Sequence, residues 1–327
     1  MPVRFTSPGL GGQDESYLRA HQWRVGVAYR RLSADKWYVG SEVREDKAPF
    51  GQPLVLNINS LDFSAEYGLS HRFSLALTLP FSSGTQSRFY ADLRRHEVSS
   101  VGLGDVNLIG TYWVGDPLTH GTGNLAVGLG VKTPTGRNHV EDDFFLADSS
   151  VVQRPVDQSV QRGDGGWGVI VQLQGFQRLL PGFYGYFLGS YLLSPRENTD
   201  VPSPVPGSPL SVPDVYSGRL GVAYSLWPSG GLSASLGGRI DGIPYSDLVT
   251  IPIHGVGGGP PGFRRPGYTV YLDPGLALTR GNTTFTLSVP IALQQSFEPS
   301  AADIATGRKG GGDLANYLVF GGINWRP

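Results

Sequence analysis

The sequence contains no cysteine, and only 16% of its 327 residues are charged. Without cysteine the chain has no thiol nucleophile, no disulfide and no cysteine-ligated zinc site. Its 26 basic and 27 acidic residues nearly cancel, whereas a nucleic-acid-binding surface needs an excess of basic charge. These absences argue against a thiol enzyme, a cysteine-based zinc module and a nucleic-acid-binding protein.

Long apolar runs are also missing. No run approaches the roughly 20 residues that a membrane-spanning helix needs, which excludes a helical membrane protein. No apolar segment follows Met1–Phe5, so we expect no signal peptide within this numbering. Glycine is abundant instead, with 47 residues, beside 15 tyrosines and 15 phenylalanines. That composition favours many short strands and turns over long helices.

Alternation of apolar and polar residues dominates the chain from Gln22 onward. In the segment 106–114, Val106, Leu108, Tyr112 and Val114 share one face, and polar residues such as Asn107 occupy much of the other. This period of two is typical of a β-strand with one apolar face. We count about twelve such segments: 22–32, 60–69, 73–81, 102–114, 124–132, 167–173, 183–193, 216–226, 232–241, 268–279, 283–293 and 313–325.

The connections between these segments alternate in length. Short turns lie near positions 70, 119, 181, 229 and 281, and long polar or glycine-rich loops lie at 33–57, 82–101, 136–165, 194–215, 242–267 and 296–312. A transmembrane barrel sorts its connections in this way, with short periplasmic turns and long extracellular loops, whereas a soluble β-sandwich has no reason to do so. The sequence predicts an all-β protein whose residues 22–327 form one antiparallel barrel in the bacterial outer membrane. Residues 1–21 form a periplasmic or lumenal segment.

Two short motifs resemble a known family. The segment 102–114 reads GLGDVNLIGTYWV, and the segment 128–136 ends in KTPTG. Together they are similar to the outer-membrane β-barrel transporters named after the meta-pathway of phenol degradation. The resemblance implies an outer-membrane location and passage of small, often hydrophobic or aromatic, compounds. One departure is that Trp325, the aromatic residue near the end of the chain, is followed by Arg326 and Pro327.

Charged residues on the polar faces point into the lumen of such a barrel. If the turn near 119 closes a hairpin, Asp105 and Lys132 lie opposite one another within about one residue. We predict that they form a lumenal ion pair that fixes the register of the hairpin. The alternative is a charged constriction that selects permeants.

The hairpin near 229 brings two positive charges together. The same counting places Arg219 beside Arg239, and two neighbouring lumenal arginines repel unless acids or an anion intervene. Asp241 and Asp273 are candidate partners, and Asp62 and Glu66 supply further lumenal carboxylates. These residues form either a polar network that packs the interior or an electrostatic lining for a channel.

Evidence for other chemistry is slight. The acidic run Glu141, Asp142 and Asp143 is a weak calcium candidate, although such runs are more often solvated loops. None of the six histidines has the spacing of metal ligands, and we expect neither a cofactor nor an enzyme. The favoured function is a passive outer-membrane channel for small molecules. A filled barrel with a structural or surface-interaction role is the alternative, followed by an outer-membrane enzyme and then a soluble binding module.

Overall fold

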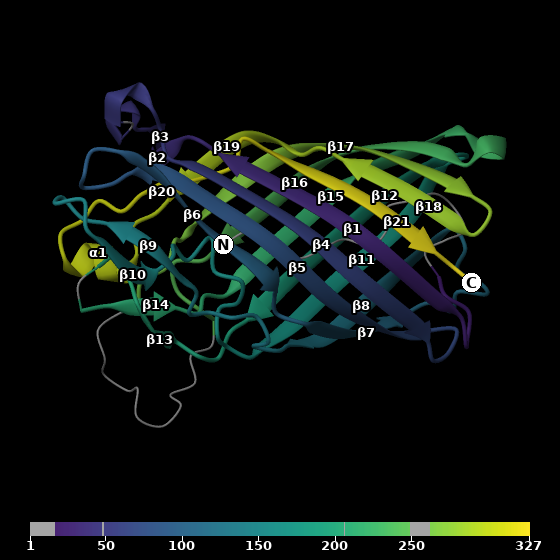
Figure 1. Ribbon diagram of the computed structural model, residues 1–327. Coiled ribbons are helices and arrows are strands. Elements are labelled where there is room, and N and C mark those ends of the chain that lie inside the picture. The colour runs from purple at the N-terminus through teal and green to yellow at the C-terminus, as the bar shows by residue number, and fades with distance from the viewer. Residues whose placement is uncertain (1–16, 48, 206, 249–261) are drawn as a thin grey trace.

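The computed structural model describes residues 17–47, 49–205, 207–248 and 262–327. The chain forms a closed antiparallel barrel of twelve strands, and the described residues contain a single α-helix, α1 (Ala301–Ala305) (Figure 1). Among these residues no helix is long and apolar enough to cross a membrane. The predicted fold class and strand number are confirmed.

The strands follow one another around the barrel in the order of the chain, and β1 pairs with β21 to close it. Two of the twelve positions are each occupied by a pair of shorter strands, β6 with β7 and β18 with β19. The wall consists of β1 (Trp23–Ala34), β4 (Val55–Gly68), β5 (Phe73–Phe89), β6 (Arg95–Leu103), β7 (Asn107–Trp113), β8 (Gly123–Lys132), β11 (Gly168–Leu180), β12 (Phe183–Leu193), β15 (Val215–Trp227), β16 (Leu232–Ile243), β17 (Gly267–Arg280), β18 (Thr283–Ser288), β19 (Ile291–Phe297) and β21 (Tyr317–Trp325).

The two ends of the barrel differ, as Figure 1 shows. Short turns gather at one end, here called the turn end, which also holds η3 (Pro228–Gly230) and the C-terminus. The other end, the loop end, carries the long connections with α1 and several small elements. These are β2 (Trp37–Val39), β3 (Glu42–Val43), η1 (Glu45–Lys47), η2 (Pro49–Gly51), β9 (Glu141–Phe145), β10 (Val151–Pro155), β13 (Asn198–Pro202), β14 (Pro209–Ser211) and β20 (Gly312–Asp313).

One predicted loop is wrong. Most of the segment 82–101 is strand, because β5 continues to Phe89 and β6 returns from Arg95 in continuous antiparallel register with it. Only residues 90–94 form the connection. The two strands extend past the pairing of β7 with β8 and build a hairpin at the loop end. The sequence predicts a loop here because polar residues occupy both faces of the segment, so its alternation is weaker than that of the neighbouring strands.

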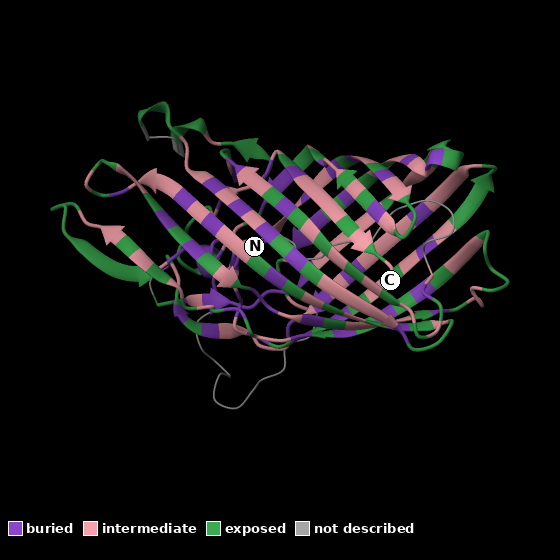
Figure 2. Ribbon diagram, turned by 45° about the vertical axis from the view of Figure 1, so that its right-hand side comes forward, coloured by how far each residue is buried: buried purple, intermediate pink, exposed green. Residues whose placement is uncertain are grey.

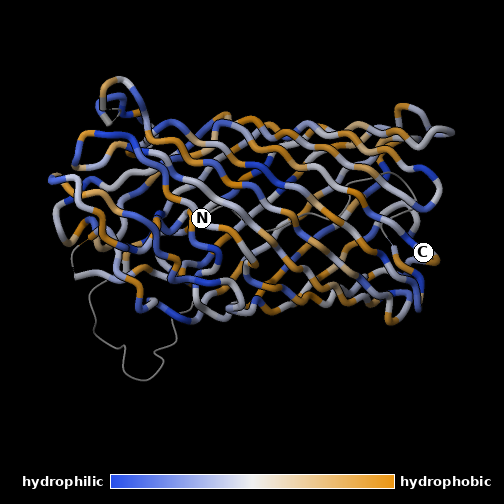
Figure 3. The backbone as a smooth tube through the Cα atoms, in the orientation of Figure 1, coloured by the Kyte–Doolittle hydropathy of each residue, from blue (hydrophilic) through white to orange (hydrophobic). Residues whose placement is uncertain are grey.

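The wall is apolar outside and largely polar inside. Along β7, Leu108 and Tyr112 are exposed on the outer surface, whereas Asn107 is buried on the inner one. Exposed and buried residues alternate along most strands in Figure 2, and apolar residues run in stripes over the wall in Figure 3. An outer apolar band and a polar interior characterise barrels that stand in a membrane.

The breaks between β6 and β7 and between β18 and β19 each lie opposite a proline of the neighbouring strand. Pro80 of β5 lies across from the break between Leu103 and Asn107, and Pro274 of β17 lies across from the break after Ser288. The carbonyl oxygens of Pro80 and Pro274 accept hydrogen bonds from the Gly104 and Val289 amides. Proline has no N–H to return, so the ladder cannot continue regularly at either site.

Candidate functional site

The lumen contains two cavities that lie one behind the other. The loop-end cavity has a volume of about 140 Å³ and is lined largely by apolar side chains such as Leu56, Ile58 and Leu318. The turn-end cavity is larger, about 250 Å³, and its lining includes Gln172, Gln174 and the ion pair of Arg24 with Glu66. Phe320 lines both cavities, so they approach one another at its level.

A belt of buried charged residues lies around this level. We call Arg30, Asp62, Arg219, Arg239, Asp241 and Asp273 the charge belt. Arg30 Nε lies 2.8 Å from Asp62 Oδ2, and Arg30 is the ladder partner of Phe320. The guanidinium of Arg239 lies over the ring of Phe320 at 4.6 Å. The belt thus follows the wall from Asp62 on β4 to Arg30 on β1 and passes Phe320 on β21. On β18, the Ser288 hydroxyl donates to Asp273 of β17, and the belt continues from there to Arg219 on β15.

The two arginines of the β15–β16 hairpin are direct ladder partners. Arg219 pairs with Arg239 across the strands, as the sequence predicts. Asp273 approaches Arg219 Nε at 2.6 Å and Asp241 approaches Arg239 Nε at 2.7 Å. Each guanidinium therefore has its own carboxylate, and the repulsion between the two positive charges is offset without a bound anion. Their role in selecting permeants stays a prediction.

Glu66 lies nearer the turn end than the belt. Its carboxylate is 3.2 Å from Arg24 Nη1 and accepts a hydrogen bond of 2.7 Å from Ser74. Both charged side chains are partly shielded and line the turn-end cavity. Of the predicted lumenal carboxylates, Glu66 and Asp62 line this wider, more polar cavity.

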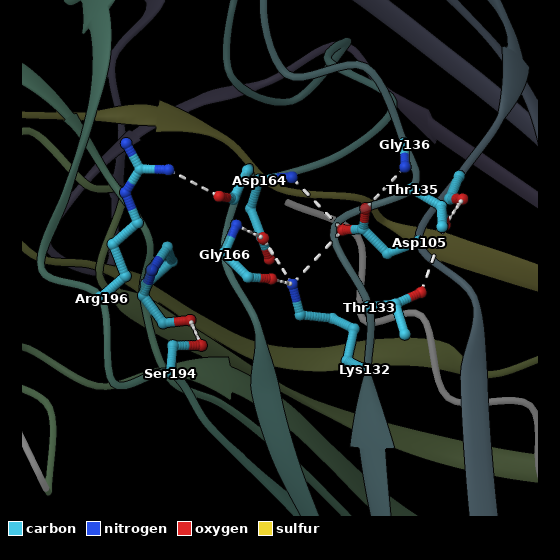
Figure 4. Close-up of polar contacts among 12 residues, drawn as sticks. Asp105, Lys132, Thr133, Thr135, Gly136, Asp164, Gly166, Ser194 and Arg196 are labelled. Atoms are coloured by element: carbon cyan, nitrogen blue, oxygen red, sulfur yellow. Dashed lines mark hydrogen bonds and ion pairs between the residues drawn. The ribbon is translucent and has the colours of Figure 1, made fainter.

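Asp105 and Lys132 meet beside the break between β6 and β7 and do not line either cavity (Figure 4). Lys132 is the ladder partner of Asn107, and its Nζ lies 3.4 Å from Asp105 Oδ2. Lys132 also donates to Asp164 and, at 2.6 Å, to the Gly166 carbonyl oxygen. All three charged side chains are buried. This arrangement favours a structural role for the pair over a constriction that selects permeants.

The residues of the two sequence motifs meet at the same break. The Thr135 hydroxyl accepts from the Val106 amide at 2.9 Å and donates to the Gly104 carbonyl oxygen at 3.0 Å. The Gly136 amide donates to Asp105 Oδ1 at 2.9 Å. These contacts satisfy backbone groups that the interrupted ladder leaves without strand partners. The GLGD and KTPTG motifs therefore close a gap in the wall.

The roof of the loop-end cavity is tied together by Arg265. Its guanidinium donates to Asp157 at 2.5 Å and to the Gly311 carbonyl oxygen at 3.1 Å, joining three long connections. Burial acts to raise the pKa of Asp157, but Arg265 and Ser159 outweigh it and hold that pKa well below its usual range. Burial raises the pKa of nearby Asp313 to about 7, although Arg265 opposes the shift. Of these two carboxyls, Asp157 is therefore ionised at neutral pH and Asp313 is partly protonated.

The calcium candidate stays a prediction, and the structure gives it no support. Glu141, Asp142 and Asp143 lie on β9, where strand alternation turns Asp142 to the opposite face from its neighbours. Asp142 accepts from the Ser99 amide and Asp143 from Gln153, so each carboxylate is used locally. No group of three or more acidic or histidine side chains in the described part of the chain could hold a metal ion.

Sequence reasoning missed three parts of this arrangement. The alternation along the first strand does not reveal that Arg30 is the partner of Asp62. Asp164 and Arg265 lie in long connections, where no periodicity indicates which way a side chain points. The available signal was composition, since Arg264 and Arg265 are adjacent charges at the end of a glycine- and proline-rich stretch.

No protein-family model and no curated protein matches the chain. Among solved structures, an outer-membrane channel from Pseudomonas putida F1 is similar over 99% of this chain and 100% of its own, with a TM-score of 0.64 and 15% identity. This likeness shows the fold. The β-domain of the Bordetella autotransporter BrkA covers 92% of this chain and 99% of its own, with 14% identity and a TM-score of 0.46. The P. putida toluene transporter TodX covers 94% of this chain and 89% of its own, with 9% identity and a TM-score of 0.43. The meta-pathway family name stays a prediction.

Proposed function

We propose that this chain is an outer-membrane channel through which small molecules pass passively, with hydrophobic or aromatic compounds as the favoured permeants. The observation that carries the proposal is the pair of cavities on either side of the charge belt, inside a barrel with an apolar outer surface. A molecule entering at the loop end meets an apolar cavity, then the belt around Phe320, then the wider turn-end cavity. The P. putida relative of the same fold is itself described as an outer-membrane channel, which supports the proposal.

A filled barrel with a structural role is the second candidate, because the belt residues are buried and paired with one another. Paired charges that pack the waist of a lumen can close it as well as line it.

Single-channel recording separates the two. We expect the purified chain in a planar bilayer to give discrete current steps with a small conductance, because the belt lies between two separate cavities. A control preparation boiled until its fast-migrating folded band is lost on a gel should give none. A folded preparation that never conducts, together with normal uptake of aromatic solutes by cells that lack the gene, would favour the filled barrel.

A further inference from the structure

The outer surface of β1 and β4 changes character near the loop end. From the turn end upward, the outward positions of both strands are apolar as far as Tyr29 and its ladder partner Leu61. The next outward positions are Arg31 and its partner Asn59, followed on β4 by Asn57. We call Arg31, Asn57 and Asn59 the rim patch. A change from apolar to polar residues on the outside of a barrel marks the level at which the wall leaves the hydrocarbon core for the lipid head groups.

The side chain of Arg31 faces outward and has no anionic partner. Arg31 belongs to the wall of the loop-end cavity, but strand alternation turns its side chain to the opposite face from that of the buried Arg30. It is exposed and forms no ion pair or side-chain hydrogen bond with any residue that the structure describes. The nearest acid along the chain, Asp35, lies beyond the end of β1 and accepts a hydrogen bond from Asn316. Arg31 therefore places an uncompensated positive charge at the edge of the apolar wall.

The two asparagines of the rim patch are oriented by hydroxyl groups. The Tyr29 hydroxyl donates to Asn59 Oδ1 at 2.7 Å, and the Ser33 hydroxyl donates to Asn57 Oδ1 at 2.9 Å. Because both amide oxygens are engaged, the groups that these side chains still offer are N–H donors. The guanidinium of Arg31 also has donors only. The rim patch thus offers a positive charge and N–H groups, which suits an anionic ligand.

These donors lie close enough together to hold one anionic group. Arg31 is directly opposite Asn59 and diagonal to Asn57. Directly opposite residues on antiparallel strands have Cβ atoms about 4.5–5.5 Å apart, and diagonal neighbours are about 7–8 Å apart. A phosphate has acceptor oxygens pointing in several directions, and arginine is a favoured partner for it. One phosphate can therefore reach all three side chains of the rim patch.

The apolar wall beside the rim patch restricts the source of that phosphate. Leu61 and its ladder partner Phe81 on β5 are both exposed on the turn-end side of the patch. A free phosphate ion leaves this surface uncovered, whereas the acyl chains of a lipid cover it. Tyr29 directs its hydroxyl to Asn59, towards the loop end, as an interfacial tyrosine turns its polar tip towards the head groups.

We propose that the rim patch binds the phosphate of a phosphorylated lipid, whose acyl chains lie along the apolar wall on the turn-end side of the patch. The site is on the outer face of the barrel and is separate from the lumen, so it goes beyond the proposed function. A head group bound there anchors the loop end of the barrel to one leaflet of the membrane.

The test is native mass spectrometry of the folded full chain in detergent, titrated with lipid A, phosphatidylethanolamine or inorganic phosphate. Lipid A carries phosphate monoesters on an acylated body, phosphatidylethanolamine offsets its phosphate with an ammonium group, and inorganic phosphate has no acyl chain. We expect saturable binding of one lipid A, about tenfold tighter than phosphatidylethanolamine, and no displacement by an equal concentration of inorganic phosphate. Equal binding of the two lipids would overturn a site for phosphate. Displacement by inorganic phosphate would assign the patch to a free anion and overturn the lipid.

Matched variants locate the site. Arg31→Gln removes the positive charge, and Asn59→Asp keeps an acceptor for Tyr29 but replaces the N–H donors with a negative charge. We expect each change to weaken binding of lipid A by about tenfold, to the level of phosphatidylethanolamine. Arg280→Gln is the control, because Arg280 faces outward at the turn end, where its guanidinium lies 4.9 Å from the centre of the Trp227 ring. This variant should bind lipid A as the wild type does.

Heat-modifiable migration on a gel verifies that each variant is folded. Wild-type affinity for lipid A in both Arg31→Gln and Asn59→Asp would refute the assignment. Weaker binding in Arg280→Gln together with unchanged binding in Arg31→Gln would place the lipid at the turn end and refute it as well.

Discussion

The turn end and the loop end of the barrel use the same strands but hold them differently. At the turn end, short hairpins join regular ladders, and the cavity is larger and more polar than the one at the loop end. At the loop end, long connections cover the opening, and buried ion pairs such as Arg265 with Asp157 tie those connections together. The two breaks in the strands lie lower, at the level of the charge belt, where Ser288 pairs with Phe320 and Pro80 pairs with Asp62. The comparison teaches that the turn end is specified by local sequence pattern, whereas the loop end depends on contacts between residues far apart in the chain.

The largest expected effect comes from removing a buried cation at the loop end. Lys132→Met leaves the carboxylates of Asp105 and Asp164 buried beside one another and should lower the free energy of unfolding by about 3–5 kcal/mol. The matched change at the turn end, Arg72→Met, removes the exposed partner of Asp116 and should leave the free energy of unfolding nearly unchanged, because water screens an exposed ion pair. Urea unfolding in lipid vesicles, followed by tryptophan fluorescence, measures both. Equal losses would erase the distinction between the two ends.

A change in the charge belt should alter conduction. Arg239→Met removes the guanidinium that covers Phe320 and leaves Asp241 facing the loop-end cavity. We expect a severalfold larger single-channel conductance and a shift towards cations, seen as a change in reversal potential in a salt gradient. In the same recordings Lys132→Met, which lies outside both cavities, should keep the wild-type selectivity. A shift in Lys132→Met and none in Arg239→Met would mean that the wall pair, and not the belt, controls permeation.

Acidity should affect the loop end through Asp313. Its pKa of about 7 in the folded protein is higher than in the unfolded chain, so the folded state binds the extra proton between about pH 4 and pH 7. The resulting stability is fully present below that range and is lost as the pH rises through 7. Asp157 has the opposite shift, and because it is ionised in both states above about pH 5 it adds no change there.

The measurement compares wild type with Asp313→Asn from about pH 5 to pH 8. We expect the wild type to lose about 2–3 kcal/mol relative to the variant over this range. Burial is the main cause of the raised pKa of Asp313, Asp157 adds to it, and Arg265 and Arg88 oppose it. The variant leaves these three charged groups unchanged. Parallel pH profiles for the two proteins would show that Asp313 titrates normally and that the roof is not held as described.

The smallest effect is expected at the gap in the wall. Thr135→Val removes the hydroxyl that bridges the Val106 amide and the Gly104 carbonyl oxygen, and should cost about 1–2 kcal/mol. Hydrogen exchange should increase at Val106 and not in the regular β15–β16 hairpin. If Val106 exchanges as slowly in the variant as in the wild type, the threonine does not close the gap.

The sequence allowed the regular part of the barrel to be predicted because alternation and turn length are local signals. The short turns, the strand count and the neighbouring positions of Arg219 and Arg239 were all recovered in this way. The contact between Asp105 and Lys132 followed from counting along one hairpin, yet Asp164, the third member, comes from a connection of unknown path. The breaks opposite Pro80 and Pro274 were missed, although proline in a central strand is a local warning. The roof around Arg265 has no periodic signal and depends on tertiary contacts alone.

The central claim is that permeants cross the lumen at the level of Phe320. Since the chain has no cysteine, a single thiol can be placed there by Phe320→Cys, with Ile323→Cys on the outer face of the same strand as control. During single-channel recording, a charged thiol reagent should reduce the current of Phe320→Cys in discrete steps and leave that of Ile323→Cys unchanged. Two outcomes would contradict the claim when both variants conduct: neither variant responds to the reagent, or both respond equally. In either case the path of the permeant does not pass through the charge belt.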